Sequence, residues 1–140
     1  MPSNRKRTFK IGFTAGQFSL IHAGYVMMFE ECKKYCDYLI VGLQTDASID
    51  RPHKSKPIMS LEERYRILRA IKWIDAIIIY ETERERIFLE SWLPYDIRFM
   101  GEDHKGRKHY GIKKPIIYTS RKHGYSSTEL RKRIIESKKI

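Results

Sequence analysis

The stretch Tyr38–Gln44, "YLIVGLQ", is a nearly continuous run of apolar residues rich in β-formers. A strand with one face in water alternates apolar and polar residues, whereas a strand covered on both faces has no need to alternate. The run therefore predicts a buried strand in a parallel sheet that has helices on both sides.

Similar runs alternate with helical patterns along the rest of the chain. Strands are predicted at Thr8–Thr14, Tyr38–Gln44, Ala76–Tyr80, Ile97–Gly101 and Pro115–Thr119. Helices are predicted at Ala23–Cys36, from Ser60, at Glu83–Trp92 and from Ser126, the second and fourth opened by the capping boxes "SLEE" and "SSTE". The polar segment Asp46–Met59 contains two prolines and predicts a loop. This order predicts an α/β fold, a Rossmann-like doubly wound sheet of about five parallel strands with helices on both faces.

The composition favours one folded domain over residues 1–140, preceded by a basic tail at residues 1–7. The chain has 28 Lys and Arg against 17 Asp and Glu, a formal charge of +11 that predicts a polyanionic partner. No apolar run approaches the ~20 residues that span a bilayer, so membrane insertion is not expected. Cys32 and Cys36 are predicted to share one helical face as packing thiols, which is typical of a reduced, cytoplasmic protein.

Two loops carry the features of anion sites. Doubly wound sheets bind ligands at the carboxyl ends of their strands, where helix N-termini converge. The first loop, "AGQFSLIHAGY" (Ala15–Tyr25), has glycines that permit close approach of a ligand and a histidine, His22, at the predicted helix start. The last loop, "SRKHGYSST", places Arg121 shortly before hydroxyl residues at another helix start. These two loops predict two phosphate cradles at one sheet edge.

Four blocks extend this pattern: "GQFSLIHAG", "TDASID" followed by "KSKPIMSLEERYRILRAIKWID", "MGED", and "RKHGYSST". Their order and spacing resemble the small cytidylyltransferases of the HxGH nucleotidyltransferase superfamily, glycerol-3-phosphate cytidylyltransferase most of all. The resemblance implies transfer of CMP from CTP to a phosphorylated alcohol such as glycerol 3-phosphate, giving a CDP-alcohol and pyrophosphate. It also implies a homodimer, and Mg²⁺ held by the CTP phosphates without a metal site on the protein.

The matching positions imply roles for individual residues. Those expected to bind the nucleotide are Gln17, Phe18, Gly24, Tyr25, Asp103, Arg121, Ser126, Ser127 and Thr128. Those expected in catalysis are His22, Lys54, Lys56 and Arg121, and those expected to bind the acceptor are Lys54, Lys56, Arg64 and Lys72. The choice between Lys54 and Lys56 stays open, because this loop carries an insertion relative to the family.

Three residues depart from the family pattern. Tyr25 stands where the family has the second signature histidine, Ser19 where it has an aspartate, and Lys72 where close relatives have arginine. A phenol can donate a hydrogen bond but is not a cation at neutral pH. These departures predict either a neutral replacement or an impaired enzyme.

Two alternatives follow from the sequence. One is an adenylyltransferase that uses ATP, of the heptose-phosphate or FMN type, because "TDASID" and "KPIMSLEER" resemble those enzymes too. The other is a catalytically impaired nucleotide-binding protein or a basic nucleic-acid binder. The basic clusters have few interleaved aromatic residues, which makes nucleic acid the weaker expectation.

Overall fold

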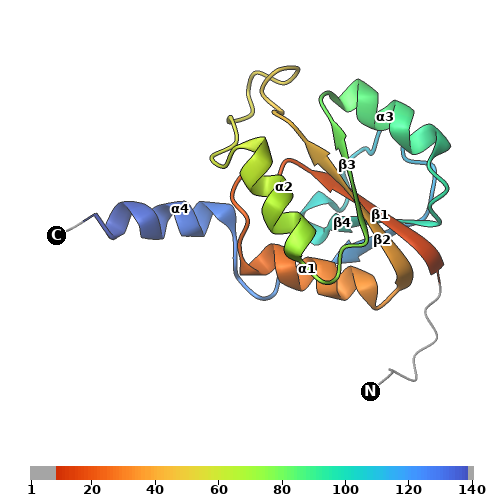
Figure 1. Cartoon of the computed structure of the whole chain (residues 1–140), viewed down its shortest axis with the longest axis horizontal. Helices are drawn as coiled ribbons and strands as arrows, with labels where there is room; N and C mark the ends of the chain where they lie inside the picture. Colours follow the sequence, from red (N-terminus) through yellow and green to blue (C-terminus); the bar gives the residue numbers. More distant parts are fainter. Residues whose placement is uncertain (1–8, 139–140) are drawn as a thin grey trace.

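The computed structural model describes residues 9–138, so the predicted basic tail at residues 1–7 lies outside the described part. One five-stranded parallel sheet organises the chain (Figure 1). Its strands are β1 Phe9–Gly16, β2 Cys36–Gln44, β3 Ala76–Tyr80, β4 Ile97–Gly101 and β5 Ile116–Thr119. The helices are α1 Ala23–Lys33, α2 Leu61–Ala70, α3 Glu83–Trp92 and α4 Ser127–Glu136, with a short 3₁₀ turn, η1, at Glu102–His104. The predicted doubly wound fold is confirmed.

The strand order is β3-β2-β1-β4-β5. The chain thus builds outward from β1 in one direction and then returns to add β4 on its other side. Such a reversal leaves a crevice at the carboxyl ends of the two central strands, where doubly wound proteins bind ligands. The order therefore points to the ends of β1 and β4 as the place for a site.

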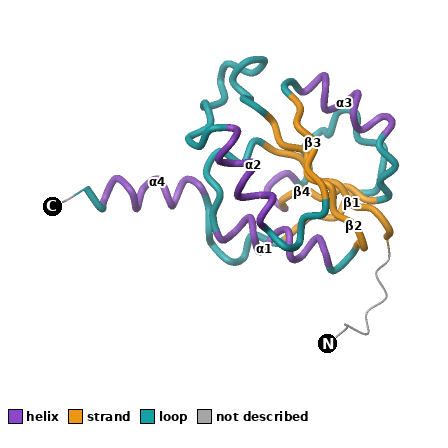
Figure 2. The backbone as a smooth tube through the Cα atoms, viewed as in Figure 1, coloured by secondary structure: helices purple, strands orange, loops and turns teal. Residues whose placement is uncertain are grey.

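Two apolar cores cover the two faces of the sheet. On one face, Leu39, Val41 and Leu43 of β2 pack with residues of α1 and α2, including Phe29 and Leu68. On the other face, Phe13 and Ile40 pack with Leu89 of α3 and with Leu93, the residue that follows this helix. The alternation of β2 side chains between the two cores explains its unbroken apolar run, and Figure 2 shows the strands lying between the helices.

The predicted helix Ala23–Cys36 is too long. Helix α1 ends at Lys33, and Cys36 is already the first residue of β2, paired with Phe9 of β1. The predicted shared helical face of the two cysteines is therefore wrong, because sheet pairing takes Cys36 into the strand. Both thiols are nonetheless buried, and the Cys36 Sγ donates to the Cys32 carbonyl at 3.5 Å.

Helix α4 projects away from the body of the protein (Figure 1), and none of its described residues is buried. At the start of α2 both halves of the predicted capping box are formed, between Ser60 and Glu63. At the start of α4, the Ser126 hydroxyl accepts from the Glu129 N–H at 3.1 Å, which is the only half of that box formed within the described chain. A single cap thus fixes where α4 begins.

Candidate functional site

Two adjoining cavities lie at the carboxyl edge of the sheet. The smaller, of about 230 Å³, is lined by the N-termini of α1 and α4 and the loop before α4. The larger, of about 590 Å³, lies over the ends of β1 and β4 and reaches the start of α3. Tyr25, Met28, Gly101 and Arg121 line both cavities. The two cavities thus adjoin at the carboxyl ends of β1 and β4, where the strand order reverses.

His22 is the N-cap of α1. Its Nδ1 accepts from the Gly24 N–H at 3.1 Å, so the neutral ring carries its proton on Nε2 and has a free donor. Burial, followed by the nearby His123 and Arg121, lowers the pKa of His22 below its usual value. At neutral pH this residue is therefore a neutral hydrogen-bond donor at the mouth of a helix.

Tyr25 lies in the first turn of α1 and forms an aromatic stack with two residues of the loop before that helix. Its ring lies 4.3 Å from the His22 ring centroid in a stacked arrangement and 5.1 Å from that of Phe18, edge to face. Phe18 itself is buried and has a left-handed backbone, with φ at 51°. Packing of the Phe18 ring offsets the cost of this conformation, and Tyr25 holds the His22 ring in place.

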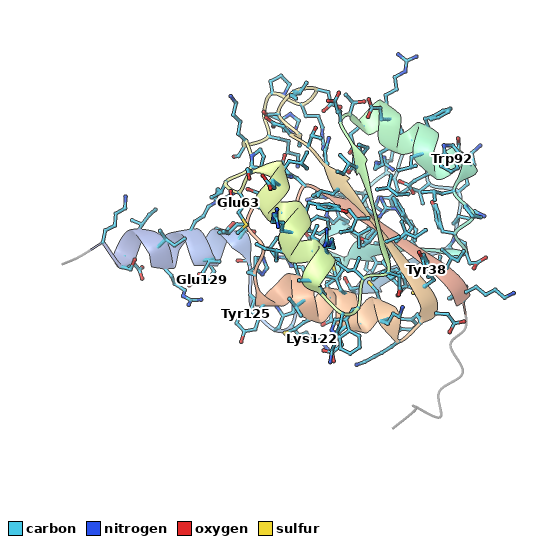
Figure 3. All side chains as sticks on the ribbon, in the orientation of Figure 1. Tyr38, Glu63, Trp92, Lys122, Tyr125 and Glu129 are labelled. Atoms are coloured by element: carbon cyan, nitrogen blue, oxygen red, sulfur yellow. The ribbon has the colours of Figure 1, made fainter. Side chains whose placement is uncertain are left out.

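The segment before α4 closes over this loop. The Ser127 hydroxyl donates to the Leu20 carbonyl at 3.5 Å, and Arg121 pairs with Asp103 of η1 at 3.1 Å. Figure 3 shows Tyr125 at the point where the chain enters α4. The first and last blocks of the sequence therefore meet, and two helix N-termini face the smaller cavity.

A second histidine, His123, lies in this segment and also lines the smaller cavity. A Cβ placed on Gly24 would lie 2.8 Å from the His123 Cε1 and 2.9 Å from the His22 Cε1, so the two imidazoles are neighbours. The His123 Nδ1 accepts from the Tyr125 N–H at 2.9 Å. Only the close approach of the two loops reveals this pair, and the one sequence signal is the histidine within "RKHGYSST".

The far end of the larger cavity is basic and partly buried. Glu90 of α3 is hydrogen-bonded to Arg86, Arg98 and Tyr95, the last at 2.6 Å. Burial alone raises the pKa of Glu90, but the charge of Arg98 and hydrogen bonds from Arg98, Tyr95 and Arg86 outweigh it and lower that pKa. The carboxylate thus stays ionised and fixes two guanidinium groups at the cavity wall.

Two further polar groups lie beside this cluster. Arg51 contacts Glu83 at 3.2 Å and the Gln44 amide oxygen at 2.9 Å. Tyr80 is 5% exposed and lines the cavity, and its hydroxyl makes no hydrogen bond with any described residue. The larger cavity therefore has a free phenol donor beside fixed positive charge.

The family model described as cytidylyltransferase-like matches residues 13–133. The chain belongs to the cytidylyltransferase-like family. Among curated proteins, it is similar to the bifunctional protein HldE of Campylobacter concisus, with 31% identity over 132 residues that cover 92% of this chain and 28% of that protein. HldE of Caulobacter vibrioides is 32% identical over 101 residues, covering 71% of this chain and 21% of that protein. The chain thus spans less than a third of the length of these relatives.

A solved structure supports the fold. The lipopolysaccharide core biosynthesis protein from Thermoplasma volcanium aligns with a TM-score of 0.60 and 22% identity, covering 91% of this chain and 88% of that one. Within the described residues of this cytidylyltransferase-like chain, no helix is both long and apolar enough to cross a membrane.

All nine residues expected to bind the nucleotide lie around the two cavities. The smaller is lined by Gly24, Tyr25, Arg121, Ser126, Ser127 and Thr128, and the larger by Gln17, Phe18, Tyr25, Asp103 and Arg121. Lys54 lines the larger cavity, whereas Lys56 is exposed and is not among the lining residues. Gln17 also holds the segment before Lys54 in place, because its Oε1 accepts a hydrogen bond from the Ala47 N–H at 2.5 Å.

Arg64 and Lys72, both expected at the acceptor, line neither cavity. Arg64 is 1% exposed, and its guanidinium donates to backbone carbonyls, which are those of Gln17, Gln44, Thr45, Met59 and Ser60. Lys72 is exposed beyond the end of α2, with its Nζ 4.6 Å from the Trp73 ring centroid. Lys72 does not share a helical face with Arg64, because α2 ends at Ala70.

Proposed function

We propose that this chain transfers a nucleotidyl group from a nucleoside triphosphate to the phosphate of a small phosphorylated compound. The observation that carries the proposal is the pair of helix N-termini at the smaller cavity, with His22 at one and Ser126 at the other. Exposed N–H groups and hydroxyls at helix starts bind phosphate oxygens. The adjoining cavity leaves room for an acceptor.

The reaction consists of one displacement. An oxygen of the acceptor phosphate attacks the α-phosphorus, a new P–O bond forms, and the bond to the bridging oxygen breaks as pyrophosphate leaves. No covalent intermediate with the protein is needed. The chain orients the two phosphates and stabilises the charge that develops on pyrophosphate, with donors from His22, Arg121 and the helix starts.

Mg²⁺ is proposed as the metal, bound mainly by the triphosphate. Within residues 9–138, two carboxylates line the larger cavity. Glu83 is paired with Arg51 and Arg86, and Asp103 with Arg121. This set fits a Mg²⁺ ion that keeps phosphate and water ligands and takes at most one or two from protein. When bound, the ion would neutralise part of the triphosphate charge.

ATP is proposed as the nucleotide in preference to CTP. The sequence resembles both glycerol-3-phosphate cytidylyltransferase and heptose-phosphate adenylyltransferases, and the HldE relatives agree better with the second type. On that basis the acceptor is proposed to be a sugar phosphate. The polar far end of the larger cavity supports this choice, since Tyr80 and Arg51 could bind hydroxyl groups beyond the reacting phosphate.

A matrix of nucleotides and acceptors tests the proposal. Pyrophosphate release is measured for ATP and CTP with heptose, hexose, glycerol and ribitol phosphates in the presence of Mg²⁺. Turnover is expected with ATP and a sugar phosphate. A preference for CTP with glycerol 3-phosphate would reverse the assignment of both substrates.

The second candidate is a catalytically impaired nucleotide-binding protein, favoured by Tyr25 in place of the second signature histidine. A ligand at 100 times its Kd stabilises a protein by about 2.7 kcal/mol. A rise in Tm with ATP or CTP, without turnover for any acceptor, would support this candidate over the enzyme.

A homodimer is also proposed. The resemblance implies it, and α4 exposes Ile134 (48%) and Ile135 (69%) on a helix that projects from the body. Sedimentation of the wild type and of an Ile134→Glu variant tests this. A wild-type monomer at micromolar concentration would contradict it.

A further inference from the structure

We propose that His123 is a second phosphate-binding imidazole of the site, in the role that the family signature gives to the residue at position 25. The inference rests on the proposed nucleotidyl transfer but concerns a residue outside the signature. It explains how the chain can hold Tyr25 at that position and keep two imidazoles at the triphosphate.

The two histidines have matching local geometry. Each Nδ1 accepts from the backbone N–H two residues ahead, Gly24 for His22 and Tyr125 for His123. In the neutral state each ring therefore carries its proton on Nε2. Each imidazole thus has one N–H left to donate, and both line the smaller cavity.

The position of Gly24 sets the spacing of the pair. The two rings leave no space for a side chain at Gly24, since a Cβ there would lie 2.8 Å from the His123 Cε1 and 2.9 Å from the His22 Cε1. The N–H groups at the start of α1 thus lie beside both imidazoles. His123 also lowers the pKa of His22, after the larger effect of burial, so the two rings already interact. An anionic phosphate bound between them would accept a hydrogen bond from each ring.

Tyr25 has a different task in this structure. Its ring is stacked on His22 and meets the edge of Phe18, which makes it part of the wall that positions His22. A phenol is uncharged at neutral pH, whereas an imidazole can gain a proton as negative charge develops nearby. His123 therefore brings to pyrophosphate what Tyr25 cannot.

His123→Asn and His123→Gln separate this role from a structural one. The Asn Oδ1 lies where Nδ1 was and can still accept from the Tyr125 N–H, but the Nε2 donor is lost. The Gln amide N–H reaches the place of Nε2, so the donor is kept while the loop contact is lost. Lys122→Ala is the matched control, because Lys122 is an exposed cation in the same loop and does not line the cavities (Figure 3).

Two readouts are needed, calorimetric Kd for inorganic pyrophosphate and for ATP, and steady-state kcat and KM. We expect His123→Asn to weaken pyrophosphate binding about 10- to 100-fold, as loss of a hydrogen bond to a charged group does. It should lower kcat more than it raises KM for the nucleotide. His123→Gln should recover part of both losses, and Lys122→Ala should change neither by more than about twofold. Tyr25→His in the His123→Asn background should restore pyrophosphate affinity in part.

The inference would be overturned if His123→Asn kept the wild-type Kd for pyrophosphate and the wild-type kcat. It would also be overturned if His123→Asn and His123→Gln lost affinity and kcat equally. Absence of turnover in the wild type would defeat the proposed function alone, because pyrophosphate affinity still decides the role of His123. A wild-type protein that binds neither pyrophosphate nor ATP would overturn both proposals.

Discussion

The polar side chains around the site fall into two groups. Some leave a polar atom free toward the cavity, and others use their polar atoms to bind the protein backbone. His22 and His123 each use one ring nitrogen to hold a backbone N–H and keep the other for the cavity. Arg64 uses its guanidinium wholly within the protein, joining the loop after β1, the end of β2 and the start of α2. Its role is thus to position the walls of the site.

Arg64→Lys should destabilise the protein by about 2–3 kcal/mol, because one ammonium cannot reach carbonyls spread around a planar guanidinium. Urea unfolding measures the loss. Arg66→Lys is the control on the same helix, since the Arg66 side chain is 75% exposed and, among the described residues, bonds only Glu62. It should change the free energy of unfolding by less than about 0.5 kcal/mol. Equal effects of the two changes would show that the buried carbonyl contacts contribute little.

His22→Asn should separate capping from phosphate binding. Asparagine is a good N-cap and can accept from the Gly24 N–H as Nδ1 does, so the free energy of unfolding should fall by less than about 1 kcal/mol. The Nε2 donor is lost, and kcat/KM for the nucleotide should fall about 10²- to 10³-fold. Turnover at the wild-type rate would remove His22 from the proposed mechanism.

At the scale of elements, α3 is fixed to the sheet by charge as well as by its apolar face. Glu90 has a fully buried side chain and joins Arg86 of the same helix to Arg98 of β4. Removing one member of a buried cluster of a carboxylate and two guanidinium groups costs much stability, because the charges that remain are buried without a partner. The cluster thus links the position of α3 to the floor of the larger cavity.

Glu90→Gln should lower the free energy of unfolding by about 3–5 kcal/mol at pH 7, measured by urea unfolding. Glu62→Gln, at an exposed carboxylate of α2, is the control and should cost less than about 1 kcal/mol. The folded-state pKa of Glu90 is lowered, so its contribution is present above the unfolded-state pKa of about 4.3 and is lost as pH falls through the lower folded value. The difference between wild type and Glu90→Gln should therefore shrink below about pH 4. A difference that stays constant down to acid unfolding would exclude an ionised Glu90.

The sequence predicts elements well where apolar runs end at clear signals. Strands β3 and β4 and helix α3 have the predicted bounds, with Pro94 closing the last. The end of α1 was not predictable from periodicity, because Cys36 continues the helical spacing and only its pairing with Phe9 places it in β2. Local motifs likewise indicated His22 and Ser126. They could not indicate His123 or the inward turn of Arg64, because both depend on contacts between loops far apart in the sequence.

At the scale of the whole molecule, charge and topology act at the same edge of the sheet. Of the residues that the structure describes, seven Lys and Arg side chains line the larger cavity, against two carboxylates. Their field adds to that of the helix starts at the smaller cavity, and the reversal of strand order between β1 and β4 opens the crevice that holds them. The net charge of +11 is thus concentrated in part where two phosphorylated substrates are proposed to meet.

Charge reversal at two positions tests whether placement matters more than net charge. Lys108 lines the larger cavity, whereas Lys34 follows α1 at the opposite edge of the sheet. The variants Lys108→Glu and Lys34→Glu lower the net charge by the same amount. At about 0.05 M salt, Lys108→Glu should reduce kcat/KM for the nucleotide about tenfold. Lys34→Glu should reduce it less than twofold, because the Debye length is then shorter than the protein and a charge at the opposite edge is largely screened from the cavity. At about 0.5 M salt the effect of Lys108→Glu should fall to a few-fold, since screening weakens exposed charges most. Steady-state kinetics at both salt concentrations decide the matter. Equal losses for the two variants would show that the protein attracts its substrates through total charge, and not through the cations gathered around the cavity.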